Sequence, residues 1–380
     1  MTAPCLLIAA GGTGGHIFPG LAVAEVLRGR GWRIEWLGSH GGLEEQLVPA
    51  RNIPLHLLAI SGLRGKGIAA LVTAPLRLLS ALLAARKVLQ QTNADVVLGM
   101  GGFASGPGGL MARLTGRALV IHEQNAVAGM TNKWLARVAT VVLAAFPQAF
   151  ATRSVRAVGN PVRKELLQLA EPVARFAERS GALRVLVIGG SRGAAVLNET
   201  VPSALAQTTA AMEVWHQTGR GQHSVTAQRY GSRADVKVSE FIDDMAAAYS
   251  WADVVICRAG ALTVSEIAAV GVPAIFVPYP HAVDDHQTAN ARYLSERNAA
   301  WLLPQNELTE ATLATRLQTL AADRALLQRT AQAARAAAIT DAAEQVAAVC
   351  EQLLKMKQDD DRSNNDHSSN NFSTRSNGNG

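Results

Sequence analysis

A stretch that combines glycine, hydroxyl and carboxylate residues, CRAGALTVSEIAAVGVPAIFVPYP at 257–280, has the residue types that bind phosphates and hydroxyl groups. The apolar run at 252–257 before it predicts a buried parallel strand. Residues 262–270 are expected to form a short helix whose first backbone N–H groups face a phosphate. Glu266, one turn into that helix, could accept hydrogen bonds from two adjacent hydroxyls, as on a ribose. The alternative is an ordinary strand-to-helix turn in which Glu266 only caps a neighbour.

Composition limits the classes of protein that the chain can belong to. Its 380 residues, 48% of them apolar, can bury two cores, and the net charge of +6 suits an anionic partner. Without a basic stripe interleaved with aromatics, nucleic acid is a minor possibility. The cysteines Cys5, Cys257 and Cys350 lie far apart without metal-ligand spacing, which favours a reducing compartment. We expect no signal peptide and no membrane-spanning run.

Two glycine-rich turns follow predicted strands in the first half. GGTGGHIFPG at 11–20 lacks the lysine of a phosphate-binding P-loop and carries Ile17 where a dinucleotide fingerprint has glycine, so a nicotinamide enzyme is disfavoured. His16 lies beyond the carboxyl end of its strand, where ligands bind in doubly wound sheets, and this location favours a functional histidine over a structural one. A second turn contains Gly101 and Gly102, and two such turns in one half can hold two phosphates or one diphosphate.

Further polar residues follow predicted strands. His122, Glu123 and Asn125 emerge from an apolar run into the same crevice, so we expect them to belong to a site. Gln287 follows Asp284, Asp285 and His286, and three adjacent residues do not converge on one metal ion. Sugar hydroxyls are therefore the expected target of Gln287.

Residues 63–88 carry leucines at helical spacing with five basic residues around them. Such a surface could lie at the interface of an anionic bilayer, or it could be an amphipathic helix packed on the sheet, which is the commoner use of the pattern.

The strand, glycine turn and helix pattern restarts at 184–201, which predicts two similar α/β halves joined by a hinge at 158–168. The polar residues 356–380 are expected to form a disordered tail, because they contain too few apolar groups to bury.

Eight motifs occur in order along the chain: GGTGGH, GGF, HEQNAVAG, GNPVR, GGSRGA, FIDDM, GALTVSE and HQ. Together they resemble the bacterial undecaprenyldiphospho-muramoylpentapeptide β-N-acetylglucosaminyltransferases of glycosyltransferase family 28. The resemblance implies the α/β GT-B class, with two Rossmann-like doubly wound domains facing across a cleft. It implies that residues 1–160 bind the acceptor and the membrane and that 161–337 bind UDP-N-acetylglucosamine. A helix at about 338–355 then packs back on the first domain.

The resemblance also assigns roles to residues. Positions that match contacts to the donor sugar nucleotide are Thr13, Gly14, Gly15, Asn125, Arg163, Ser191, Ile242, Ala261, Leu262, Thr263, Val264, Ser265, Glu266 and Gln287. Among them, Arg163 and Ser191 lie on the phosphate side and Ile242 reads the uracil. His16 matches the residue proposed as catalytic base, and Glu123 is the other catalytic candidate. Arg192 stands where glutamine is common, which puts its neighbours' contacts in doubt.

The implied reaction transfers N-acetylglucosamine, with inversion, from UDP-N-acetylglucosamine to undecaprenyl-diphospho-N-acetylmuramoyl-pentapeptide, lipid I, to give lipid II. It requires a base for the attacking hydroxyl and a stabiliser of the leaving diphosphate, and helix N-termini with Arg163 would supply the latter without a metal or cofactor. The resemblance places the protein peripherally on the cytoplasmic side of the inner membrane, with other cell-wall and division proteins as candidate partners. Another UDP-sugar transferase or epimerase on this fold, and a non-catalytic nucleotide-sugar module, stay open.

Overall fold

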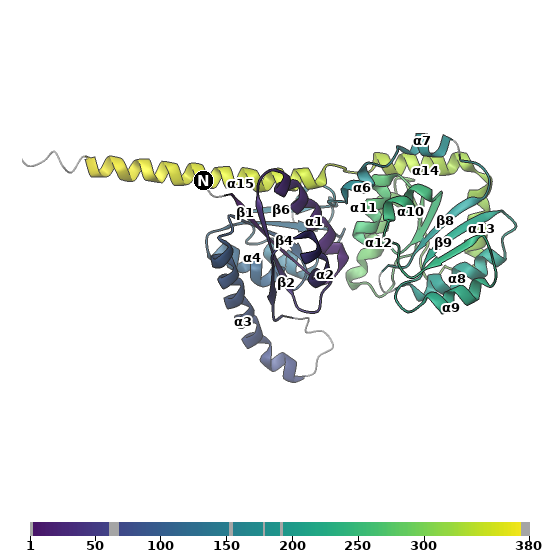
Figure 1. Cartoon of the computed structure of the whole chain (residues 1–380), viewed down its shortest axis with the longest axis horizontal. Helices are drawn as coiled ribbons and strands as arrows, with labels where there is room; N and C mark the ends of the chain where they lie inside the picture. Colours follow the sequence, from purple (N-terminus) through teal and green to yellow (C-terminus); the bar gives the residue numbers. More distant parts are fainter. Residues whose placement is uncertain (1–2, 61–67, 152–154, 178, 191–192, 374–380) are drawn as a thin grey trace, which may run out of the picture. The chain divides into compact units, whose positions relative to one another are not determined.

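The structure, a computed structural model, describes residues 3–60, 68–151, 155–177, 179–190 and 193–373 (Figure 1). It divides into two compact units. The first unit comprises Met1–Glu123, Gly129–Leu143 and Ala343–Gly380, and the second comprises Gln124–Ala128 and Ala144–Ala342.

The first sheet has seven strands in the order β3-β2-β1-β4-β5-β6-β7. Its elements are β1 (Cys5–Ala10), α1 (Gly14–Gly29), β2 (Arg33–Ser39), α2 (Glu44–Leu47), η1 (Pro49–Arg51), β3 (Leu55–Leu58), α3 (Ile68–Thr92), β4 (Val96–Gly101), α4 (Ser105–Leu114), β5 (Ala118–Glu123), α5 (Met130–Leu135), β6 (Val141–Ala144) and β7 (Arg156–Ala157). The central strands β1 and β4 are buried along their whole length, as their continuous apolar sequences require.

The second sheet has six strands in the order β10-β9-β8-β11-β12-β13. Its unit contains α6 (Lys164–Leu167), α7 (Pro172–Ala177), β8 (Leu183–Ile188), α8 (Ala195–Ala206), β9 (Met212–Gln217), α9 (His223–Tyr230), β10 (Val236–Ser239), α10 (Met245–Trp251), β11 (Val254–Cys257), α11 (Ala261–Val270), β12 (Ala274–Phe276), η2 (Val283–Asp285), α12 (His286–Ser295), β13 (Trp301–Leu302), α13 (Glu310–Ala322) and α14 (Arg324–Ala336).

Helices cover both faces of the second sheet (Figure 1). Successive side chains of a strand point to opposite faces, so one strand contributes to two cores. Val254 and Ile256 of β11 pack with residues of α8 and α13, whereas Val255 and Cys257 pack with residues of α10, α11 and α12. Both faces are therefore apolar and both are covered, which explains why the strand sequences do not alternate with polar residues.

The division of the chain differs from the expected boundary at residue 160. Residues after Leu143 already belong to the second unit, because their side chains pack there: the Phe146 and Tyr293 rings meet edge to face at 5.0 Å between centroids. Asn125 also belongs to the second unit and not to the N-terminal half in which we expected it.

The C-terminal helix α15 (Ala342–Ser373) differs from the expected tail. Its buried residues, including Val346, Cys350 and Leu353, belong to the first unit, where Arg30 pairs with Glu351 at 2.8 Å. The helix continues through 356–373, where we expected disorder.

Candidate functional site

Most of the predicted site residues gather at the points where the strand orders reverse. The first sheet reverses between β1 and β4, and the second between β8 and β11. At such a point the loops after the two strands diverge and leave a crevice for a ligand. His16 follows β1 and the Gly101–Gly102 turn follows β4, while helix α11 follows β11. Each unit therefore carries one candidate site, described separately below.

In the first unit the two glycine turns are in direct contact. A Cβ atom on Gly102 would lie 2.4 Å from the Gly11 carbonyl oxygen, and one on Gly101 would lie 2.9 Å from Nδ1 of His16. Both Gly101 and Gly102 have positive φ, at 99° and 84°. Only glycine therefore allows this turn to lie against the His16 ring and the first turn.

The start of α1 is suited to bind an anion or a polar ligand. Thr13 is the N-cap residue in extended conformation, its side chain makes no capping hydrogen bond, and the first helical turn has no acidic residue. Gly14 and Gly15 thus bring backbone N–H groups to the helix terminus without side chains beyond them.

Ser105 and Glu44, which the sequence did not single out, support these turns. The Ser105 hydroxyl accepts the Gly101 N–H at 2.9 Å and also contacts the Ala9 carbonyl, joining the ends of β4 and β1. The Glu44 carboxylate is fully buried, and its Oε2 accepts the Gly12 N–H at 2.9 Å. The sequence gave no signal of this role, because Gly12, the glycine-turn partner of Glu44, is 32 residues away.

Glu123, at the end of β5, is 1% exposed. Its Oε2 accepts hydrogen bonds from the Asn132 amide at 2.8 Å and from the Gly129 N–H at 3.0 Å. The carboxylate therefore holds the segment where the chain re-enters the first unit.

In the second unit, Glu266 is buried in α11 and is bonded on both carboxylate oxygens. Arg163 Nη2 donates to Oε1 at 2.9 Å, and the Tyr249 hydroxyl donates to Oε2 at 3.2 Å. Burial, together with the nearby charge of Glu266, raises the pKa of Tyr249 well above its ordinary value, so the phenol remains a donor. Arg163 Nε also donates to Oε1, at 3.3 Å, so Oε1 already accepts two hydrogen bonds. Oε2 accepts the Tyr249 hydroxyl, and its second lone pair can accept a ligand hydroxyl.

The residues before Glu266 divide between the surface and the core. Leu262, Thr263 and Ser265 are partly exposed, whereas Ala261 and Val264 are buried in the core. Gly260 is the N-cap of α11, and no acidic residue occupies the first turn. The first N–H groups of α11 therefore form a second helix terminus suited to phosphate.

Two buried asparagines, missed at the sequence level, join three of the predicted motifs. Asn160 Nδ2 donates to the Ser265 hydroxyl at 2.9 Å and to the Gln124 carbonyl at 3.1 Å. Asn290 Oδ1 accepts the Ala126 N–H at 2.7 Å, and its Nδ2 donates to Asn125 Oδ1 at 3.3 Å. These bonds bring Asn125 close to the start of α11. In sequence, Asn160 between Gly159 and Pro161 indicated only a turn.

The glycine turn after β8 is clamped by Gln217. Its amide accepts the Gly190 N–H at 3.1 Å and donates to the carbonyls of Gly190 and Glu240, both at 3.0 Å. Glu240 directly precedes Phe241 and the predicted uracil reader Ile242, which is partly exposed. Ser191 and Arg192 lie outside the described residues.

Gln287, the predicted sugar contact, lies in the first turn of α12. Its Oε1 accepts the Tyr279 N–H at 2.9 Å, which fixes the orientation of the side-chain amide.

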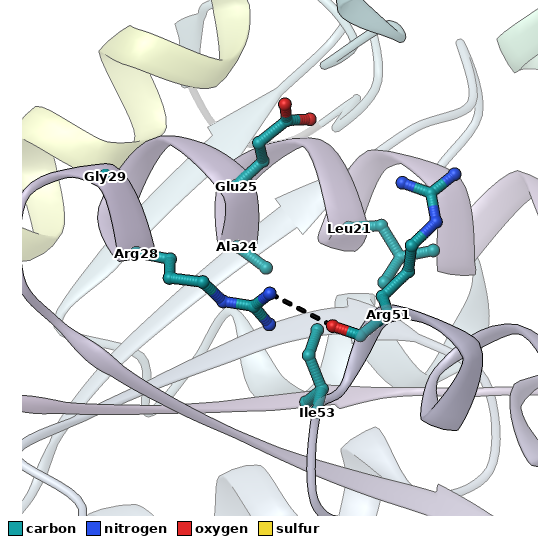
Figure 2. A pocket seen from close by; sticks show the side chains of 7 residues that line it. All are labelled: Leu21, Ala24, Glu25, Arg28, Gly29, Arg51 and Ile53. Carbon is teal, nitrogen blue, oxygen red and sulfur yellow. Dashed lines mark hydrogen bonds between the residues drawn. The ribbon is translucent and has the colours of Figure 1, made fainter.

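A surface pocket of about 360 Å³ in the first unit contains none of the predicted site residues (Figure 2). It is lined by Leu21, Ala24, Glu25, Arg28, Gly29, Arg51 and Ile53. Arg28 Nη1 donates to the Arg51 carbonyl at 3.0 Å, and the Glu25 carboxylate points away from that pair. The polar groups do not converge, so this pocket lacks the arrangement expected of a ligand site.

The helices α3, α4 and α5, of which α4 contacts the other two, carry exposed apolar and basic side chains. We call this the α3–α5 surface; its exposed apolar side chains are Leu76, Leu78, Leu79, Leu83, Leu110, Leu114, Met130 and Trp134. Its exposed basic side chains are Arg77, Arg86, Lys87, Arg113 and Lys133. The buried face of α3 is formed instead by Ala81, Ala85 and Leu89, so Leu76 and Leu79 are not core residues. Residues 63–67 of the predicted stripe lie outside the described residues.

Comparison with known proteins agrees with this arrangement. The family model of the glycosyltransferase family 28 N-terminal domain matches residues 6–144, and that of the C-terminal domain matches residues 184–346. The chain belongs to glycosyltransferase family 28. This membership confirms the resemblance carried by the eight motifs.

Individual proteins are also similar to this chain. The UDP-N-acetylglucosamine--N-acetylmuramyl-(pentapeptide) pyrophosphoryl-undecaprenol N-acetylglucosamine transferase of Aeromonas hydrophila subsp. hydrophila is 57% identical over 352 residues, covering 92% of this chain and 96% of the relative. The crystal structure of Acinetobacter baumannii MurG is 42% identical and has a TM-score of 0.80, covering 92% of this chain and 100% of that one. A putative UDP-N-acetylglucosamine 2-epimerase from Listeria monocytogenes, 15% identical with a TM-score of 0.66, covers 92% of this chain and 96% of that one, and shares the fold alone. The predicted GT-B class is confirmed.

His216 provides a test of the packing behind the second glycine turn. It is fully buried on β9, contacts the Tyr230 hydroxyl at 2.7 Å and Asn198 Oδ1 at 3.0 Å, and burial lowers its pKa from 6.5 to about 3. Below pH 6.5 the unfolded chain therefore binds a proton that the folded chain excludes. Stability from this group is complete above that pH and is lost as the pH falls toward 3, by about 1.4 kcal/mol per pH unit.

We expect the His216→Gln variant to have a flatter dependence of its unfolding free energy on pH between 6 and 4 than the wild type. Denaturant titrations at several pH values measure this. Tyr230→Phe removes a partner but keeps the titrating ring, so it should keep the wild-type slope. Parallel curves for His216→Gln and the wild type would contradict the neutral buried state.

Proposed function

We propose that this chain transfers N-acetylglucosamine from UDP-N-acetylglucosamine to the lipid-linked muramoyl-pentapeptide diphosphate, the reaction for which its relatives are named. The observation that carries the proposal is made at helix α11. The carboxylate of Glu266 is buried just beyond its first turn, and that first turn contains no acidic residue. This arrangement places a hydroxyl acceptor and an anion site on one short helix, as binding of a nucleoside diphosphate requires.

On the donor side, we assign the ribose hydroxyls to Glu266 and the diphosphate to the N-terminus of α11. Arg163 supports this assignment because its guanidinium, at 2.9 Å from Glu266, keeps a positive charge beside the carboxylate. The glycine turn held by Gln217 would receive the second face of the diphosphate. Ser191, which follows this turn in sequence, stays a candidate contact from the resemblance alone. Ile242 would read the base, and the oriented amide of Gln287 would donate to a sugar hydroxyl.

On the acceptor side, His16 is assigned as the base that takes the proton of the attacking muramoyl hydroxyl. Its ring lies against the Gly101 backbone, beside a turn whose N–H groups could hold the acceptor diphosphate. Glu123 is assigned a supporting role, since its carboxylate accepts two hydrogen bonds from the segment after β5. Product formation from radiolabelled UDP-N-acetylglucosamine and a short-chain lipid acceptor tests the reaction. Formation of UDP-N-acetylmannosamine would instead indicate an epimerase. Binding of the sugar nucleotide without any product would indicate a binding module.

The Glu266→Ala variant should bind UDP about 10²-fold more weakly than the wild type. Two hydrogen bonds to a charged acceptor contribute on the order of 3 kcal/mol, and Arg163 loses its partner. Isothermal calorimetry with UDP alone measures the change. Glu165→Ala, which removes an exposed carboxylate two positions from Arg163, is the matched control and should bind UDP normally. Unchanged affinity of Glu266→Ala would contradict the ribose assignment.

The His16→Ala variant distinguishes a base from a phosphate binder. A base must be neutral, so its loss should lower kcat by roughly 10²-fold and abolish the acidic limb of the pH–rate profile, with the acceptor KM little changed. A cationic phosphate binder would instead raise the acceptor KM. His40→Ala, at an exposed histidine of the same unit, is the control. If His16→Ala keeps its kcat and its acidic limb, the base is another residue, and Glu123→Gln is the next variant to measure.

We also propose that the α3–α5 surface attaches the protein peripherally to the anionic cytoplasmic leaflet, where the lipid acceptor lies. The support is chemical: eight exposed apolar side chains and five exposed basic ones share the surface, and the sequences of α3, α4 and α5 contain no acidic residue. Among the described residues, no helix is long and apolar enough to cross a membrane. Apolar insertion and attraction to anionic headgroups then act together.

Replacing Leu76 and Leu79 with serine should release the protein from vesicles that contain phosphatidylglycerol. Each leucine that inserts contributes about 1.5–3 kcal/mol, so binding should fall at least tenfold. Because these side chains are 71% and 53% exposed, the melting temperature should not change. Val225→Ser, at a 51% exposed position of the second unit, is the control in the same co-sedimentation experiment. A double variant that still binds these vesicles would contradict the proposal.

A further inference from the structure

The first unit contains a buried carboxylate that the reaction described above does not use. Glu44, the first residue of α2, is 0% exposed. Besides the Gly12 N–H, it binds Ser39 at the end of β2: its Oε1 accepts the Ser39 N–H at 3.0 Å and the Ser39 hydroxyl at 3.1 Å. A buried carboxylate is tolerated only with such donors, so its position is closely determined.

Three glycines make room for the Glu44 side chain. A Cβ atom would lie 2.2 Å from Oε1 on Gly11, 1.9 Å from Oε2 on Gly42 and 2.8 Å from Cγ on Gly38. Any larger residue at these positions would displace the carboxylate. The space around Glu44 is therefore as specific as its hydrogen bonds.

Glu44 is connected to His16 through two short steps. Gly12, whose N–H it accepts, directly precedes the N-cap residue Thr13, and His16 lies in the first turn that follows. Gly11, which packs on the carboxylate, also contacts Gly102 through its carbonyl, and Gly101 of the same turn packs on the His16 ring. A shift of the Glu44 carboxylate must therefore move Gly11 and, through it, the Gly101–Gly102 turn that packs against the His16 imidazole.

We propose that Glu44 is a positioning residue of the acceptor side, which fixes the orientation of the glycine turn and thereby the place of His16. This inference rests on the proposed function. Because Glu44 holds the Gly12 N–H and Ser105 holds the Gly101 N–H within the protein, neither of these N–H groups is left for the acceptor diphosphate. Glu44 itself touches no substrate.

The first test compares Glu44→Gln with Glu45→Gln. Glutamine at 44 presents an NH₂ group to a backbone donor, so the turn must shift, and displacements of this kind lower kcat by about 10- to 100-fold. The affinity for UDP, measured by calorimetry, should not change, because its site is in the second unit. Glu45, next along the same helix, has a side chain that is 40% exposed and bonds the Gly41 N–H, and Glu45→Gln should behave as the wild type.

A second test uses the contact between Gly11 and Glu44. Gly11→Ala should lower kcat in the wild-type background, because the methyl group overlaps Oε1. In a Glu44→Ala background, Gly11→Ala should lower kcat little further. The nearest remaining atom, Ser39 Oγ, would lie 3.3 Å from the new methyl carbon. Additive losses would overturn the proposal. If Glu44→Gln does not fold, Ser39→Ala, which removes only one donor, should give a smaller loss of kcat.

NMR of the His16 imidazole separates this inference from the proposed function. Glu44→Gln should shift the His16 ring resonances, and Glu45→Gln should leave them in place, whatever reaction the enzyme catalyses. Absence of product from the wild type, with shifted resonances in Glu44→Gln, would overturn the function and keep the positioning role. Unshifted resonances, or full kcat in a folded Glu44→Gln protein, would overturn the positioning role.

Discussion

A buried polar side chain needs hydrogen-bond partners, and in this chain the partners are the loops that follow parallel strands. Glu44 holds the turn after β1 in this way, Gln217 holds the turn after β8, and Asn160 holds the start of α11. The two glycine turns carry no regular structure of their own. Their conformations depend on side chains that are distant in sequence and bonded to their backbones.

The two units meet this requirement with different charges. In the first unit the supporting groups include the carboxylates Glu44 and Glu123, which place negative charge behind the loops. Behind the glycine turn of the second unit the supports are Gln217 and His216, a neutral amide and a histidine whose pKa is lowered to about 3. Because charges interact strongly across a protein interior, the two glycine turns differ in the electrostatic environment that their supports give them.

The sequence predicted the parts of the structure that depend on local patterns. Apolar runs located the strands, and the glycine turns and the helix at 261–270 lie where the patterns indicated. The supports were not predicted, because Asn290 and Glu44 act on partners far away in the chain and look like ordinary surface residues. The two uses of the 63–88 pattern could not be separated either, since periodicity gives a helix an apolar face but does not say whether leucine or alanine meets the sheet.

The first unit is built from segments that lie far apart in the chain, so it can be completed only late in translation. Most of the second unit, Ala144–Ala342, lies in the chain between the greater part of the first unit and the segment Ala343–Gly380 that completes it. During translation the second unit is therefore complete before Val346, Cys350 and Leu353 have left the ribosome. Until then the surface of the first unit that these side chains cover stays open to water, and domains generally fold as units. The inserted unit can thus reach its native state first, and the last helix closes the domain that was begun first.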